Sequence, residues 1–374
     1  MKKKAGKEPS FLEALTNLGE EKGISSDILF DAIEMALISA YKKNFNSAAN
    51  ARVMVDRKTG AYHVYAIKTV VENVTDDITE ISLGAARTIR GDYEPGDIVE
   101  IEVTPANFGR IAAQTAKQVV MQRVREAERE NIFEAYTNRE GDIVTGLIQR
   151  IEGRSVFMEI GKTEAILSQG EQIAGEEYKS GERMKVYIIE VKRANKGPQI
   201  AVSRTHPGLL KKLFELEVPE IAEGVVEIKS VAREPGMRSK IAVYSEDESV
   251  DALGSCVGPK GLRVQAIVGE LGAEKIDIVK WNANSAVYIA NALSPAKVVS
   301  VAVNEDEKVS RVVVPDYQLS LAIGKEGQNA RLAAKLTGWK IDIKSESEAE
   351  GETLEEGMSE YKVTSEDSFT AEGA

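Results

Sequence analysis

The chain has 374 residues, of which 43% are hydrophobic and 29% are charged, a composition typical of globular proteins. At about 100 to 200 residues per domain, this length predicts two to four domains. One cysteine and two histidines are too few for a disulfide framework or a multi-thiolate zinc site, so we expect a reducing, cytoplasmic compartment and no metal. No apolar run approaches the roughly eighteen residues of a membrane helix, so we expect no membrane partner.

The formal net charge of −12 is concentrated at one end of the chain. Residues 346–374 contain ten acidic residues and one basic residue, which gives this segment −9 and leaves the rest of the chain close to neutral. A near-neutral body can carry local basic surfaces, so the net charge does not exclude an anionic partner. Because residues 346–374 are also poor in large apolar side chains, they are predicted to be a disordered acidic tail.

Residues 1–137 are predicted to form an α/β domain. Its first helix is capped by Ser26 or Asp27 and carries apolar residues at helical spacing. Three segments rich in β-branched and aromatic residues follow and predict strands: 51–56, 61–71 and 97–103. A long helix, from about residue 111 to 136, closes the domain.

Residues 138–205 are predicted to form a small β-barrel. Short apolar segments alternate there with turn residues, which predicts five strands: 142–151, 155–160, 164–168, 183–193 and 199–204. Five short strands in a segment of this size favour an OB-type barrel, a fold that often binds single-stranded nucleic acid.

After residue 205 the sequence repeats itself. The loop that begins at Gly258 has a counterpart that begins at Gly324, and the word Lys-Ile-Asp-Ile recurs at Lys275 and Lys340. Each copy predicts helix, strand, strand, helix, G-x-x-G, helix and strand. The repeat therefore predicts two further domains, 206–282 and 283–345. The short linkers, 205–209 and 281–285, predict that the domains do not tumble freely.

A G-x-x-G between two helices brings bare backbone to a helix N-terminus, where unpaired N–H groups and the helix dipole attract phosphate. The elements around each loop resemble the KH domain, whose G-x-x-G loop clamps about four nucleotides of a single strand. Helix corners with glycine for tight packing are the competing explanation, and two copies in register argue against it. Neither loop has the spacing of a P-loop or of a dinucleotide-binding fingerprint.

The loops and the helices after them supply the candidate RNA contacts. Lys260 and Lys325 are best suited to meet phosphate, and Arg263 and Arg331 follow on the first turns of the next helix. Glu326 would repel phosphate, so we expect it to point to solvent. A solvated surface charge is the alternative for each lysine and arginine. The other candidate contacts are Gly258, Pro259, Gly261, Gly324, Gly327, Gln328 and Asn329.

A barrel followed by two KH copies resembles the NusA family of bacterial transcription termination and antitermination factors. The resemblance rests on six short sequence segments: 114–129, 215–221, 234–243, 257–267, 275–281 and 322–333. It implies an α+β multidomain protein with an N-terminal α/β domain, an S1 (OB-type) barrel, two tandem type II KH domains and the acidic tail. It further implies a monomer without enzymatic activity or cofactor. This protein would bind core RNA polymerase near the flap and RNA exit channel, nascent single-stranded RNA, and other Nus antitermination factors.

The resemblance also assigns roles to four residues outside the KH copies. Arg110 and Lys117 match basic positions that face the exiting RNA hairpin, with surface solubility as the competing explanation. Phe157 matches an aromatic of the S1 motif that stacks on a base, with a core aromatic as the alternative, and Arg204 matches a basic residue of the S1 pattern. A second S1 aromatic and a histidine near Ser168 are missing, which shifts RNA affinity toward the KH pair.

Other functions remain open on the sequence alone. A phosphate-dependent exoribonuclease also combines KH and S1 modules, but in the opposite order and after a much larger core. His63, His206 and Cys256 lack the context of a nucleophile or a triad. A ribosome-associated or mRNA-binding S1/KH protein, or less favourably an RNA-degradation subunit, is the alternative function. The tail would either compete weakly with RNA or keep the protein soluble.

Overall fold

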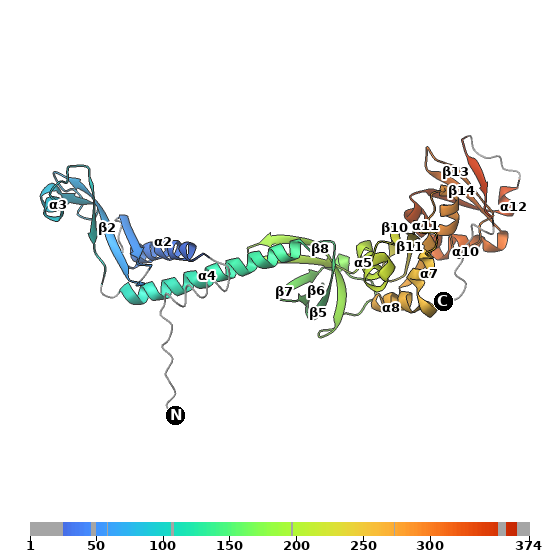
Figure 1. Ribbon diagram of the computed structural model, residues 1–374, viewed down its shortest axis with the longest axis horizontal. Coiled ribbons are helices and arrows are strands. Elements are labelled where there is room, and N and C mark those ends of the chain that lie inside the picture. The colour runs from blue at the N-terminus through green and yellow to red at the C-terminus, as the bar shows by residue number, and fades with distance from the viewer. Residues whose placement is uncertain are drawn as a thin grey trace, which may run out of the picture. The chain divides into compact units, whose positions relative to one another are not determined.

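The computed structural model describes residues 25–45, 50–57, 59–105, 108–195, 197–272, 274–350 and 357–364. The chain divides into two compact units, Met1–Ile132 and Phe133–Ala374 (Figure 1). In the described ranges, no helix is both long and apolar enough to cross a membrane.

The first unit combines a β-sheet with helices. Its described elements are, in chain order, α2 (Ser26–Phe45), β1 (Asn50–Val55), β2 (Tyr62–Val71), β3 (Glu80–Ser82), α3 (Leu83–Ile89), β4 (Ile98–Glu102) and α4 (Phe108–Thr137), whose last residues belong to the second unit. Strand β2 pairs with β1 and β4 antiparallel and with β3 parallel. The predicted helices and three strands are confirmed, whereas β3 and α3 were not predicted.

The larger core of this unit lies between α2, the sheet and α4. Leu29, Ile33 and Leu37 recur at helical spacing on α2 and are buried. On α4, every fourth residue from Phe108 to Val124 is buried, and two of these residues are alanines. Small side chains let the helix approach its neighbours closely, so the core is continuous along this part of α4.

The second unit begins with the barrel. Its strands are β5 (Ile143–Glu152), β6 (Ser155–Ile160), β7 (Thr163–Leu167), β8 (Arg183–Ala194) and β9 (Gly197–Ser203). They close in the order β5-β6-β7-β9-β8, with β8 paired to β5. The last turn of α4 packs against this barrel, because the Tyr136 hydroxyl donates to Ile160 O and Arg193 lies 4.3 Å from the centroid of the Phe133 ring. The five predicted strands are confirmed.

The two KH copies follow. The first contains α5 (Pro207–Glu217), α6 (Pro219–Ala222), β10 (Glu227–Glu234), β11 (Arg238–Tyr244), α7 (Ala252–Val257), α8 (Leu262–Glu270) and β12 (Lys275–Lys280). The second contains α9 (Ser285–Ala292), β13 (Ser300–Asn304), β14 (Val309–Val314), α10 (Leu319–Ile323), α11 (Gln328–Thr337), β15 (Lys340–Ser345), α12 (Glu346–Ala349) and β16 (Ser359–Lys362). In both copies the strand after α8 or α11 is parallel to the middle strand, β11 or β14.

The sheet of the first KH copy is covered on both faces. Ile241 and Val243 pack with α5 and α8, whereas Ala242 between them packs with α9 and α11 of the second copy. On the same face as Ala242, Lys240 is fully buried and its ammonium donates to Asp277 at 2.9 Å and to a carbonyl of the second copy at 2.7 Å. The two KH copies therefore share one core and are not independently packed domains.

Two parts of the predicted disordered tail have regular structure. Helix α12 begins in a capping box, in which the Ser345 hydroxyl accepts from Glu348 N and the Glu348 carboxylate accepts from Ser345 N. Strand β16 pairs antiparallel with β13 and packs Tyr361 against the KH core. The prediction of disorder is wrong for α12 and β16, because a capping box and an open sheet edge offset their polar composition. The other tail residues after 350 include 351–356 and 365–374, which lie outside the described ranges.

Candidate nucleic-acid interface

The two G-x-x-G loops have the same backbone conformation. The first glycines, Gly258 and Gly324, have φ/ψ of 73°/174° and 75°/173°. The third residues, Lys260 and Glu326, are left-handed at 53°/28° and 54°/26°. Positive φ with extended ψ is essentially restricted to glycine, and the left-handed region costs other residues roughly 1–2 kcal/mol. The loops are therefore one specific structure built twice.

The helices that follow the loops begin without a side-chain cap. The N-cap residues of α8 and α11 are Gly261 and Gly327, both left-handed and without a side chain to accept from the first-turn N–H groups. In contrast, side chains of His206, Asp251 and Asn284 cap α5, α7 and α9. Helices α8 and α11 thus offer first-turn N–H donors, at the positive end of the helix dipole, to an external anion.

The fifth residue after each first glycine ties the loop to the preceding helix. Arg263 Nη1 donates to Ser255 O at 2.6 Å, and Asn329 Nδ2 donates to the equivalent Leu321 O at 3.3 Å. Arg263 also pairs with Glu220 at 2.9 Å. Asn329 is 3% exposed, so burial of its side chain argues against the predicted contact with RNA. Arg263 is held by protein acceptors and reaches RNA only if its pair with Glu220 opens.

The first glycines are required by packing as well as by backbone conformation. A Cβ on Gly258 would lie 2.6 Å from Arg263 Cγ, and a Cβ on Gly324 would lie 2.8 Å from Asn329 N. Both distances are far below ordinary van der Waals contact. Any side chain at either glycine therefore displaces the residue that ties the loop down.

The exposed residues of the two loops differ in charge. Pro259 and Lys260 are exposed in the first loop, and Lys325 and Glu326 in the second. Neither lysine is ion-paired within the described part of the chain. The first loop therefore presents one cation and the second presents a cation beside an anion. Both depend on backbone N–H groups for much of their attraction to phosphate.

Gln328 and Arg331 lie on the first turn of α11 and contact the first KH copy. Arg331 Nε donates to Glu234 Oε1 at 2.6 Å, and Gln328 Nε2 donates to Glu234 Oε2 at 2.9 Å. Arg331 Nη1 also donates to Glu326 O, within the loop, at 3.2 Å. The Arg331 side chain remains 48% exposed. These two candidate RNA contacts are thus part of the junction between the KH copies.

In the barrel, Phe157 is half-buried and one face of its ring is covered. The Arg150 guanidinium lies 4.3 Å from the ring centroid. Arg150 is held in place by Glu152 at 2.5 Å and by a two-point contact with Glu164. A base that stacks on this face of Phe157 must displace Arg150, or must stack on the guanidinium itself.

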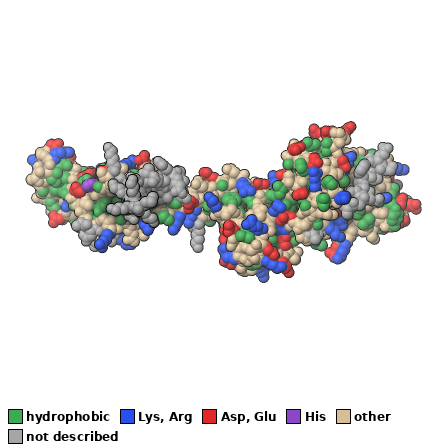
Figure 2. Space-filling view, turned by 60° about the horizontal axis from the view of Figure 1, so that its bottom comes forward, with side chains coloured by type: hydrophobic (Ala, Val, Ile, Leu, Met, Phe, Trp, Pro, Cys, Tyr) green, Lys and Arg blue, Asp and Glu red, His purple; other side chains and the backbone are tan. Residues whose placement is uncertain are grey.

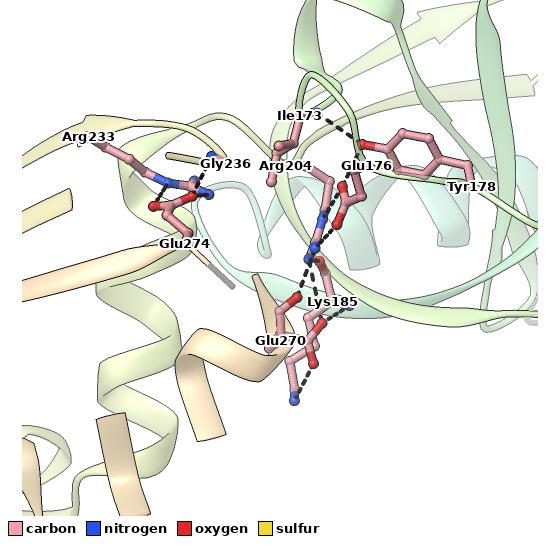
Figure 3. Close-up of polar contacts among 9 residues, drawn as sticks. All are labelled: Ile173, Glu176, Tyr178, Lys185, Arg204, Arg233, Gly236, Glu270 and Glu274. Atoms are coloured by element: carbon pink, nitrogen blue, oxygen red, sulfur yellow. Dashed lines mark hydrogen bonds and ion pairs between the residues drawn. The ribbon is translucent and has the colours of Figure 1, made fainter. Parts of the chain in front are cut away.

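Arg204 is buried at the junction between the barrel and the first KH copy (Figure 3). Its side chain is 1% exposed and is ion-paired with Glu176 of the barrel. Its Nη1 donates to Lys185 O at 2.9 Å, and its Nη2 donates to Glu270 O, at the end of α8, at 2.8 Å. The predicted contact of Arg204 with RNA would require these bonds to open, because all of its donors face protein acceptors in two modules.

Arg110 and Lys117 belong to the first unit and lie two turns apart on α4. Both side chains are exposed. The seven-residue spacing places them on one face of the helix, away from the buried stripe that includes Ala112 and Ala116. This face is exposed and carries two cations.

On the face of the second unit that Figure 2 shows, charge does not mark a single binding path. Figure 2 shows Lys and Arg side chains interspersed with Asp and Glu over its visible face. Within the described ranges, no group of three or more His, Cys, Asp or Glu residues is placed to hold a metal ion. What marks the loops is the backbone geometry that they share.

The residues that the sequence did not reveal are mostly acidic. Glu220, Glu234 and Glu270 each hold an arginine or a glutamine that a single sequence presents as a free surface group. Their partners lie far away along the chain, so no spacing rule links them. The only signal was indirect: Glu220 and Glu234 lie in two of the segments that carry the family resemblance, 215–221 and 234–243.

Comparison with known proteins supports the same division. Four family models match consecutive segments: NusA N-terminal domain (10–130), S1 RNA binding domain (137–203), NusA-like first KH domain (204–281) and NusA-like second KH domain (285–351). A transcription termination/antitermination protein NusA from Halalkalibacterium halodurans is 60% identical over 97% of this chain and 95% of its own length. The chain belongs to the NusA family.

Two further relatives of the same name are also similar over at least 90% of this chain and of their own length. The Bacillus subtilis NusA is 62% identical over 90% of this chain and 91% of its own length, and the Thermus thermophilus NusA is 42% identical over 93% and 92%. The match to the second NusA-like KH domain runs to residue 351 and so includes α12. Within the NusA family, α12 therefore belongs with the second KH copy and not with a separate tail.

Proposed function

We propose that this protein acts in transcription termination and antitermination by binding core RNA polymerase and the nascent single-stranded RNA. The relatives from Halalkalibacterium halodurans and Bacillus subtilis carry that functional name and align with nearly the whole chain. The observation that carries the RNA-binding part is the pair of G-x-x-G loops with the same backbone in one compact unit. Membership in this family does not favour a ribosome-associated protein or an RNA-degradation subunit.

Each KH loop binds RNA chiefly through its backbone. The uncapped first-turn N–H groups of α8 and α11 donate to phosphate oxygens, and Lys260 and Lys325 add charge beside them. The absence of a side chain at Gly258 and Gly324 keeps the approach open. Because α8 and α11 begin at different places on one body, a single RNA strand engages both loops in turn.

The first unit supplies the contact with RNA polymerase near the flap and the RNA exit channel. In this proposal, the shared face of Arg110 and Lys117 meets the RNA hairpin as it leaves the enzyme. The barrel adds a stacking contact through Phe157 and Arg150, which is weaker than a platform of several aromatics. The protein acts as a monomer together with other Nus factors, without catalysis of its own.

The test is a pull-down with bacterial core RNA polymerase, followed by a hairpin-pause assay with the same preparation. Retention on the polymerase together with a longer pause at the hairpin supports the proposal. Retention on ribosomal subunits but not on polymerase would contradict it and favour the ribosome-associated alternative. If the protein is retained on polymerase but the pause is no longer than without it, the polymerase contact stands and the proposed effect on pausing is contradicted.

A further inference from the structure

The turn between β10 and β11 of the first KH copy reaches every module of the second unit. We count with it the last two residues of β10, so that it comprises Arg233, Glu234, Pro235 and Gly236, and we name these four residues the junction turn. Consecutive side chains and backbone groups of this turn contact the barrel, the linker and the second KH copy. The proposed RNA-binding role of the loops does not by itself account for this arrangement.

Toward the linker, the junction turn is anchored by a buried ion pair. Arg233 Nε and Nη2 donate to the two Glu274 carboxylate oxygens at 2.8 and 2.9 Å, and neither side chain is exposed (Figure 3). Arg233 Nη1 donates to His206 O, in the linker after the barrel, at 3.0 Å. Gly236 N donates to Glu274 at 2.8 Å. The turn is thus fixed to the chain segment that leaves the barrel.

Toward the barrel itself, the junction turn makes a contact that only glycine permits. Gly236 has a φ of +77°, and a Cβ there would overlap Ile173 Cγ2 of the barrel. Beside this contact, Arg204 bridges Glu176 of the barrel and Glu270 of α8. The barrel and the first KH copy are therefore held together at two adjoining points.

Toward the second KH copy, Glu234 clamps the helix that follows the G-x-x-G loop. Its carboxylate accepts from both Gln328 and Arg331 and is only 15% exposed. Hydrogen bonding to Arg331 is the largest effect on this carboxyl, and together with Gln328 it holds the pKa of Glu234 below its ordinary value despite burial. Through Arg331, which also donates to Glu326 O, the clamp reaches the loop.

We propose that the junction turn sets the position of the second KH loop relative to the first loop and the barrel, with Glu234 as the positioning residue. The inference rests on the proposed RNA-binding function. When two linked sites are held at a fixed spacing, engagement of the first raises the effective concentration of the strand at the second. Loosening the spacing lowers the affinity for an RNA that spans both loops and spares an RNA that fills only one.

The binding test uses the full chain and two RNA probes. One probe has about four nucleotides, the length that one KH loop clamps, and the other has about ten. Glu234→Ala is expected to lower the affinity for the long probe about tenfold or more, while the affinity for the short probe changes less than about twofold. The matched control is Glu227→Ala, which removes a carboxylate from the other end of β10, where it pairs with Lys229. This control is expected to bind both probes as the parent does.

Two outcomes would overturn the inference. Unchanged affinity for the long probe in Glu234→Ala would show that the clamp does not matter for RNA. Equal weakening of both probes would show that Glu234 supports only the loop beside it. If the parent binds the long probe no more tightly than the short one, the proposed engagement of both loops by one RNA strand fails. The RNA-free measurement described next still decides the role of the junction turn.

The RNA-free measurement is a distance between spin labels on the two KH copies. Gln265→Cys and Lys340→Cys place labels on exposed positions of α8 and β15. The native Cys256 is buried, which raises the pKa of its thiol to about 12 and keeps it from reacting. A narrow distance distribution in the parent that broadens in Glu234→Ala supports the inference. An equally narrow distribution in both would contradict it.

Discussion

Arg263 and Asn329 occupy the same position in the two KH copies and donate to the same carbonyl of the preceding helix, Ser255 O in one and Leu321 O in the other. One copy uses a guanidinium paired with Glu220, and the other uses a buried amide. Two different chemistries thus produce one loop geometry. Since neither side chain is free, the cations available to RNA in the loops are the exposed lysines.

The salt dependence of RNA binding should report those lysines. Replacing Lys260 and Lys325 together with Gln should weaken binding and reduce the slope of log K against log salt by about 1 for each phosphate that is no longer neutralised. The matched control, Lys211→Gln with Lys297→Gln, removes two exposed lysines elsewhere on the KH copies. Titrations at several salt concentrations check this. An unchanged slope in the loop variant would mean that its lysines neutralise no phosphate.

Arg204 should matter for stability and not for RNA. Arg204→Ala leaves Glu176 without its buried partner and Glu270 with Lys185 alone; breaking a buried pair typically costs about 3–5 kcal/mol of unfolding free energy. Arg183→Ala, at an exposed position of β8, should cost less than about 0.5 kcal/mol. Denaturant unfolding gives both values. Normal stability with weakened RNA binding in Arg204→Ala would support its predicted role as an RNA contact.

The ion pair between Arg233 and Glu274 should lose its contribution to stability at low pH. Burial acts to raise the pKa of Glu274, but hydrogen bonds and charge from Arg233, with further help from Ser239 and Gly236, hold it below its ordinary value of 4.5. A carboxyl whose folded pKa is lowered stabilises the fold fully above its unfolded pKa. That contribution is lost as the pH falls through the lower, folded pKa.

The variant Glu274→Gln tests this dependence, because it mimics the protonated carboxyl at every pH. The difference in unfolding free energy between parent and variant should be large at neutral pH and should shrink below a pH of about 4.5. Fluorescence of Trp281 and Trp339 reports unfolding of the two KH copies. A difference that stays constant through this range would contradict the account.

The tail should stabilise the second KH copy without competing for RNA. Deleting residues 351–374 leaves α12 in place, removes β16 from the edge of β13 and uncovers the core beside Tyr361, so this copy should unfold at lower temperature. RNA affinity should not change, because β16 lies at the opposite sheet edge from β15, which α10 and α11 contact. Deleting only 365–374 keeps β16 and serves as control. Tighter RNA binding after the longer deletion would instead support competition.

Sequence alone predicted the features that depend on residue type. Only glycine adopts the backbone of Gly258 and Gly324, so the loops could be recognised, and alternating β-branched residues marked the barrel strands. The short elements β3 and α3 were missed, because three and seven residues give too little periodicity. Strand β16 was missed because its polar composition resembles that of a disordered tail.

What could not be predicted depends on partners that are distant in sequence. Arg204 directly follows β9, and the local sequence is the same whether its side chain faces solvent or acceptors in two modules. Asn329 looks like a polar first-turn residue, yet it is enclosed by carbonyls of α10 and of Leu293. No local feature of the sequence around Glu234 predicts its contacts with Gln328 and Arg331. Such roles follow only from the packing of domains against each other.

The most direct measurement is the affinity of the full chain for single-stranded RNA after Gly258→Asp and Gly324→Asp are combined. The account predicts a loss of at least about tenfold, because each change puts a carboxylate and a strained backbone where phosphate is bound. Gly269→Asp, on α8 with open space around it, should bind as the parent does. Circular dichroism confirms that each variant is folded. Undiminished RNA binding by the folded double variant would contradict the central claim that the two loops hold the RNA.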